Sequence, residues 1–165
     1  MAQSWKMVSL TIGAQPIDVA STTQNHAFGS RIRGKDLNGD GEAEFIYLQG
    51  KANTVVGSWV TYDLDNGSTT LLAANAIGPV AVAMSACDAT TKFGWYCIFG
   101  KPEAQMAANF ADDGNIYATA TAGVADDAVV AGDRVKEAYG AQTITSAGLA
   151  EVRISYPFMD DGLAA

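Results

Sequence analysis

The sequence predicts an all-β protein, with a small β-barrel or β-sandwich body preceded by an extended N-terminal arm. Short apolar runs recur along the chain, and glycine, asparagine or aspartate bounds nearly every run. Long apolar stripes with the 3.6-residue period of an amphipathic helix are absent. A chain of 165 residues suits a single domain, and this spacing of strands and turns favours a barrel or a sandwich.

The apolar runs, taken in chain order, are predicted to be strands. The clearest pair is a hairpin, because residues 61–64 and 68–72 flank the turn Asp65-Asn66-Gly67. Asn-Gly readily adopts the positive φ values that a tight hairpin turn requires. The predicted strands span residues 44–49, 58–62, 69–73, 80–85, 93–99, 114–120, 134–138 and 149–156.

One stretch, residues 102–110, carries helix signals. Pro102 suits a first helical position, and Glu103 would place a carboxylate in the first turn, where the helix dipole favours negative charge. The same stretch is equally compatible with a connecting loop. Both alternatives stay open on sequence alone.

The two ends of the chain differ from the body, residues 31–158. Residues 1–30 are predicted to be an extended arm, because the polar segment 21–26 has no pattern and the apolar residues before it are irregularly spaced. We expect this arm to take its order from a partner, and residues 159–165 to form a flexible tail. The candidate partner contacts in the arm are Trp5, Val8, Leu10, Ile12, Ile17 and Phe28.

The formal net charge is −8, which argues against nucleic acid as a partner, because phosphate binding needs clustered lysine and arginine. Basic and acidic side chains balance over residues 1–55, so the whole excess of acid lies in the later residues. This asymmetry is explained either by ordinary solubility charge or by a first segment that docks on a partner. No apolar run approaches the roughly 20 residues of a membrane span, so no membrane partner is expected.

The segment from Asp36 to Glu44 resembles a calcium loop. Asp36, Asn38 and Asp40 place oxygen atoms at alternate positions around a glycine turn, as Ca²⁺ requires. An EF-hand, however, needs glutamate at the twelfth position, and that residue is Tyr47, inside a predicted strand. The simpler interpretation is a turn that leads into a strand. We expect no cofactor, with Ca²⁺ at these three residues as the alternative.

Catalytic signals are weak. The only histidine, His26, lies in the polar arm, and the two cysteines, Cys87 and Cys97, lie in strand-like stretches where a small buried side chain is the simplest interpretation. Aspartate doublets at 112–113, 126–127 and 160–161 adjoin small residues, as in solvated turns. We therefore expect a protein that is not an enzyme, with a carboxylate-dependent hydrolase as the alternative.

The strand predicted at 93–99 is apolar on both faces. Strand alternation places Phe93, Trp95 and Phe99 on one face and Tyr96 on the other. Since one small barrel has one interior to fill, the second face is expected to pack against another subunit. These four residues are the candidate oligomer contacts.

Three runs carry a resemblance to a known family: FGSRIRG at 28–34, EFIYLQG at 44–50 and VGSWVTYD at 56–63. They resemble a group of tailed-bacteriophage head proteins, and the segment GNIYAT at 114–119 is similar to capsid decoration proteins of small β-barrel type. The likeness covers roughly residues 27–156 and continues through residues 78–84, 93–96, 133–135 and 148–152.

The resemblance implies a decoration, or cement, protein that binds the outer surface of an icosahedral phage head at junctions of the major capsid protein. It implies a homo-oligomer, usually a trimer and sometimes a dimer, on a virion assembled in the bacterial host cytoplasm. Residues 36–44 are longer than the turn expected of that family, so their role stays open. The alternative function is a head-fibre or receptor- or carbohydrate-binding β module with exposed tryptophan or tyrosine.

Overall fold

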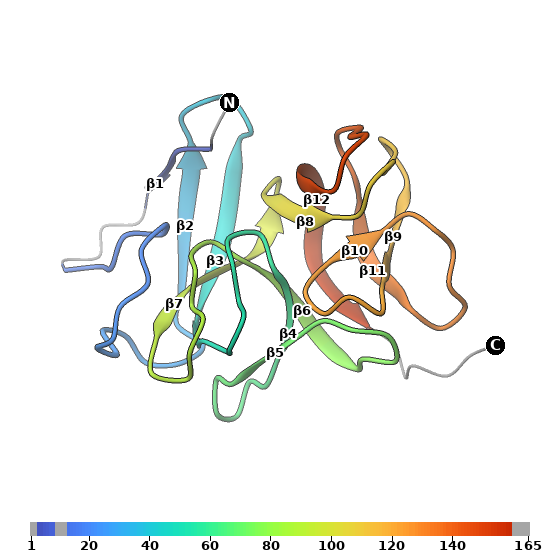
Figure 1. Cartoon of the computed structure of the whole chain (residues 1–165). Coiled ribbons are helices and arrows are strands. Elements are labelled where there is room, and N and C mark those ends of the chain that lie inside the picture. Colours follow the sequence, from blue (N-terminus) through green and yellow to red (C-terminus); the bar gives the residue numbers. More distant parts are fainter. Residues whose placement is uncertain (1–2, 9–12, 160–165) are drawn as a thin grey trace.

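The computed structural model describes residues 3–8 and 13–159, which form strands and connecting loops without a helix (Figure 1). The predicted all-β class with a barrel is confirmed. The strands are β1 (Trp5–Met7), β2 (Arg31–Asp36), β3 (Glu42–Gln49), β4 (Trp59–Tyr62), β5 (Thr69–Leu71), β6 (Gly78–Ala83), β7 (Phe93–Gly100), β8 (Glu103–Met106), β9 (Asn115–Ala118), β10 (Ala125–Asp126), β11 (Arg134–Gly140) and β12 (Gly148–Met159).

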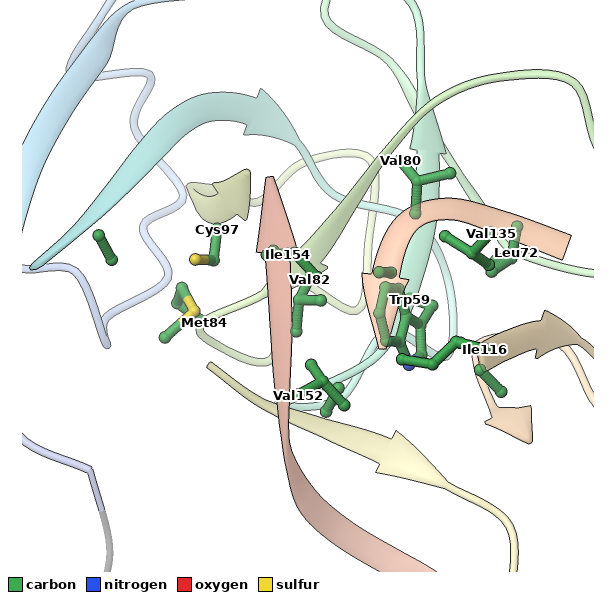
Figure 2. Close-up of a cluster of buried hydrophobic side chains, with 14 of the residues drawn as sticks. Trp59, Leu72, Val80, Val82, Met84, Cys97, Ile116, Val135, Val152 and Ile154 are labelled. Carbon is green, nitrogen blue, oxygen red and sulfur yellow. The ribbon is translucent and has the colours of Figure 1, made fainter. Parts of the chain in front are cut away.

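Five strands of the C-terminal half close into a barrel. The ring runs β8–β10–β9–β11–β12 and returns to β8; β8 and β10 are parallel, and every other pair is antiparallel. Alternate side chains such as Ile116, Val135 and Val152 point into the barrel and are fully buried. Trp59 and Leu72, from the N-terminal half, lie among them and fill the interior (Figure 2).

The remaining strands extend outward from the barrel through β12. This strand, 12 residues long, pairs with β11 and β8 in the barrel and also with β6 and β7. From β7 the sheet continues through β3 and β2 to the edge strand β1, while β4 pairs with β6 and β5 pairs with the other edge of β4. One long strand therefore belongs to both halves of the molecule and joins them.

Strand β7 is buried on both faces within one chain. Trp95 and Cys97 belong to the larger core, which continues into the barrel, whereas Tyr96 and Ile98 belong to a second core. The hairpin of β4 and β5 lies against this second core, since Val60 belongs to it and Tyr62 and Leu71 pack on it. The apolar second face of β7 is thus covered by the chain itself, which corrects the reason given for a subunit contact there.

Residues 13–30 lie against the body, which differs from the expected arm that takes its order from a partner. The Gln15 carbonyl accepts a 2.8 Å hydrogen bond from the Trp95 indole, and its side-chain oxygen accepts one of 2.9 Å from the Tyr47 hydroxyl. Ile17 is buried, and Ser21 forms a β-bridge with Phe93. This segment is therefore ordered by hydrogen bonds to one glutamine. It needs no periodic apolar pattern of the kind that predicts a helix or a strand.

Residues 102–110, the possible helix or loop, contain strand β8. Ala104 and Met106 point into the barrel while their neighbours point outward, and β8 pairs antiparallel with β12 from Gly148 to Glu151. The helix signals at Pro102 and Glu103 are local, and barrel pairing overrides them. Each predicted strand is present with ends shifted by a few residues, whereas β1, β2, β8 and β10 were not predicted.

Candidate functional site

A groove opens on the exposed face where β2, β3 and β7 meet β12. Its central hollow, of about 270 Å³, continues into a larger one of about 390 Å³ beside β11 and a smaller one of about 240 Å³ beside β2. We call this surface the aromatic groove. The central hollow is lined by Arg33, Glu42, Glu44, Phe99 and Tyr156. Arg31 lines the smaller hollow, and Tyr139 and Arg153 line the larger one.

Two aromatic rings form the wall of the groove. The Phe99 and Tyr156 ring centroids are 5.6 Å apart, and the side chains remain 40% and 48% exposed. The Arg31 guanidinium lies 5.9 Å from the Tyr156 ring centroid, in a cation–π arrangement. These rings offer a partner apolar surface that no described part of the chain covers.

Glu44 fixes both residues that flank it. Its carboxylate accepts hydrogen bonds from the Tyr156 hydroxyl at 3.1 Å and from the Arg31 guanidinium at 3.2 Å. Partial burial, followed by the neighbouring Glu44 carboxylate, raises the pKa of Tyr156 above the usual tyrosine value. The hydroxyl therefore stays protonated as a donor, and the ring is held in place before any ligand arrives.

The backbone at Tyr156 is strained. Its φ is +53°, and Glu137, in the facing part of β11, has a φ of +59° where the register of β11 and β12 breaks. Left-handed backbone at a residue other than glycine is uncommon, and such strain persists where packing and hydrogen bonds enforce it. The break is a bulge that takes Tyr156 out of the paired ladder and places it in the groove.

The larger hollow is bordered by a charged cluster. The Lys101 ammonium lies 3.0 Å from an Asp40 carboxylate oxygen and also pairs with Glu151. Hydrogen bonding to Glu151 raises the pKa of Lys101. Gly100 beside it has a φ of +121°, and a Cβ there would lie 2.9 Å from the Ala43 Cα atom, so glycine is required at the groove floor.

The candidate calcium residues lie in the turn between β2 and β3. The buried Asp36 carboxylate accepts hydrogen bonds from the backbone amides of Ser4 and Asn38, both at 2.8 Å, and from that of Asp40 at 3.3 Å. Asp40 is engaged by Lys101 and by the Gln3 side-chain amide. Within residues 3–8 and 13–159, no three His, Cys, Asp or Glu side chains are grouped to hold a metal ion.

The candidate arm contacts divide into three groups. Trp5, Ile17 and Phe28 pack on the body, with Trp5 edge-on to Phe45 at 5.4 Å between ring centroids. Val8 is half exposed, whereas Leu10 and Ile12 lie outside the described residues. Of the described candidates, Val8 is therefore the one whose side chain a partner reaches most freely.

The candidate oligomer contacts are also separated by the fold. Trp95 and Tyr96 are buried in the two cores, so neither can form a subunit contact without unfolding. Phe93 is partly buried against the larger core, and Phe99 is exposed in the aromatic groove. Phe99 is thus the one of the four that is available to a partner.

Sequence reasoning missed most of the groove, because its residues are dispersed along the chain. Glu44 and Tyr156, joined by a hydrogen bond, are 112 positions apart. One usable signal was the alternation of Arg31, Arg33 and Lys35 with inward residues along β2. That signal marks an exposed strand face and gives no indication of the facing aromatic pair.

Both cysteines are buried, and burial raises the pKa of each thiol, so neither side chain is activated as a nucleophile. No helix in the described part of the chain is long and apolar enough to cross a lipid bilayer. Comparison with models of protein families, with curated proteins and with solved structures found no match.

Proposed function

We propose that this chain is a structural virion protein, a capsid decoration protein that binds the outer surface of an icosahedral phage head. The observation that carries the proposal is the aromatic groove, where exposed tyrosine, phenylalanine and arginine side chains are held in place. Tyrosine and arginine are enriched among the residues that dominate binding energy at protein interfaces. In this proposal the major capsid protein is the partner, and the chain carries no catalytic activity.

The body supports this role through its packing. Two cores share strand β7, and β12 joins the outer sheet to the barrel, so the docking surface rests on a scaffold that is packed throughout. Because the side chains of this surface are already held in place, binding a partner orders few of them further. Less of the binding energy is therefore lost to side-chain entropy. Repeated copies on a symmetric shell then add avidity.

The test is cosedimentation with undecorated heads of the phage that encodes the chain. We expect the double variant Phe99→Ala/Tyr156→Ala to bind about ten-fold or more weakly, since truncated interface anchors commonly cost at least about 1.4 kcal/mol. The matched control is Leu64→Ala, which truncates an exposed side chain in the β4–β5 turn. Circular dichroism verifies that each variant is folded. Undiminished binding by the double variant contradicts the role of the groove, and no binding by the wild type contradicts the function.

One observation favours a second function, a head-fibre or carbohydrate-binding module. Exposed aromatic rings beside carboxylate and guanidinium groups, as at Tyr156, Glu44 and Arg31, suit a ligand with one apolar face and several hydroxyls. A glycan array probed with the wild type and the double variant separates the alternatives. Glycan binding that the double variant loses, together with no binding to heads, favours this module.

A further inference from the structure

Strands β1 and β2 carry a basic cluster on their exposed face. Lys6 on β1 lies directly opposite Lys35 on β2, and Arg33 lies two positions before Lys35 on the same exposed face of β2. Among the described residues none of these three side chains forms an ion pair, although Glu42 and Glu44 are their neighbours on β3. Like charges directly opposite each other in a sheet repel, so Lys6 and Lys35 disfavour each other, and Glu42, opposite Lys35 on β3, offsets part of that repulsion.

The barrel carries an acidic cluster in the loop that leads into β9 and at the end of β10. It consists of Asp112, Asp113, Asp126 and Asp127. A 2.9 Å hydrogen bond from the Ala111 amide to the Asp127 carboxylate brings these two segments together. In the described part of the chain no lysine or arginine forms an ion pair with any of the four. Backbone amides donate to three of these carboxylates, and no ion pair among the described residues neutralises their charge.

An exposed apolar side chain adjoins each cluster. Val8, two positions from Lys6 and hydrogen-bonded through its amide to the Arg33 carbonyl, is 51% exposed. Val129, two positions after Asp127, is 80% exposed, and Val130 beside it is also exposed. Each end thus combines an apolar contact with surrounding charge, which is the composition of a protein interface with a dry centre and a polar rim.

The two clusters lie at opposite ends of the molecule, with β1 and β2 on the left of Figure 1 and the β9–β11 end of the barrel on the right. We infer that the chain associates head to tail with a second copy of itself, the basic cluster of one copy binding the acidic cluster of the next. Every copy carries both partners of the contact, opposite in sign, and within residues 3–8 and 13–159 neither cluster forms an ion pair. Such a heterologous contact closes into a ring or continues as a filament.

This inference does not rest on the proposed function, because it concerns only contacts between copies of the chain. The contact between copies leaves the aromatic groove accessible to another partner, except at Arg33, which belongs to the basic cluster and also lines the groove. The basic cluster alone would also suit a nucleic acid. The acidic excess of the chain opposes that alternative, and the test below includes it.

The experiment is sedimentation velocity of the full chain at about 20 mM and about 500 mM salt, where screening lengths differ several-fold. We expect oligomers at low salt and at least about ten-fold weaker association at high salt. The variants Lys6→Glu/Lys35→Glu and Asp112→Lys/Asp126→Lys should each be monomeric under both conditions. A mixture of the two variants should associate again at low salt, because each supplies the cluster that the other lacks.

The matched control is Lys51→Glu/Lys92→Glu, which changes the net charge by the same amount outside both clusters and should associate like the wild type. Three results would overturn the inference: a wild type that is monomeric at low salt, a control that loses association like the cluster variants, or variants that fail to associate when mixed. Binding of a fluorescein-labelled single-stranded DNA by a monomeric wild type would assign the basic cluster to nucleic acid instead.

Discussion

At the scale of single residues, the second core contains a buried phenol. Tyr96 is completely buried, and its hydroxyl lies near the side chains of Thr69 and Cys87 without a well-formed hydrogen bond to either. Burial, as the largest cause, raises the pKa of Tyr96 far above the usual tyrosine value, and it also raises the pKa of Tyr62 and Tyr47. The folded protein therefore resists deprotonation of these phenols.

The sign of the resulting pH dependence follows from that shift. The stabilisation is fully present below the unfolded-state tyrosine pKa of about 10 and is lost as the pH rises above it. Urea denaturation between about pH 8 and about pH 11 should show a falling free energy of unfolding, with a shallower fall for Tyr96→Phe. The phenylalanine variant is a fair control, because it removes the ionisable hydroxyl and keeps the buried ring. Equal slopes in the two proteins would contradict the prediction.

At the scale of elements, residues 13–28 form a fixed segment of the body. Gln15 connects this segment to β3 and β7 through the Tyr47 hydroxyl, the Trp95 indole and the Phe93 carbonyl. The His26 ring lies edge-on to Tyr47, with 5.0 Å between ring centroids, and its Nε2 accepts a hydrogen bond from the Gln15 amide. The segment is thus held by polar contacts that converge on one side chain and its backbone.

Removing that side chain should loosen the whole segment. Gln15→Ala removes the acceptor of the buried Tyr47 O–H, and a buried donor left unsatisfied costs about 1–3 kcal/mol. It also removes the side-chain amide that donates to the Phe93 and Val19 carbonyls, and each such hydrogen bond contributes about 0.5–1.5 kcal/mol. We expect a loss of about 2–4 kcal/mol in the free energy of unfolding measured in urea. Thr23→Ala, in the exposed part of the same segment, should change it by less than about 0.5 kcal/mol. A Gln15 variant as stable as the control would show that the segment does not depend on this residue.

At the scale of the whole molecule, the barrel and the outer sheet share one core. Trp59 comes from β4 in the N-terminal half, is fully buried, and lies among the barrel residues Ile116 and Val152 (Figure 2). Because β12 pairs on both sides of the junction, neither half can unfold without exposing the interior of the other. We therefore expect one cooperative unfolding transition.

The variant Trp59→Ala should destabilise both halves together. Truncating a fully buried tryptophan costs about 3–5 kcal/mol, and no hydrogen bond is lost, since the indole nitrogen has no partner in the described chain. Far-ultraviolet and near-ultraviolet circular dichroism should report coincident melting curves, shifted to lower temperature relative to the wild type. Two separate transitions in the variant would contradict a shared core.

Local patterns in the sequence determined the class of fold and most of its strands. The period-2 alternation of runs such as residues 149–156 reports which positions face a core, and Asn66-Gly67 encodes the turn between β4 and β5. Gly67 has a φ of +71°, as the tight turn requires. These features depend on neighbours within a few residues, so the sequence contains all the information needed to predict them.

Tertiary structure alone decided the strand pairing and the groove. The alternation of apolar residues shows that a side chain is buried, but it does not show which other part of the chain covers it. The second face of β7 is covered by β4 and β5 of the same chain, and β8 is a strand because the barrel pairs it with β12. The aromatic groove depends on a bulge at Tyr156 and on Glu44, which lies 112 positions earlier. Contacts over such separations arise from the pairing order of the strands, and that order is a property of the whole fold.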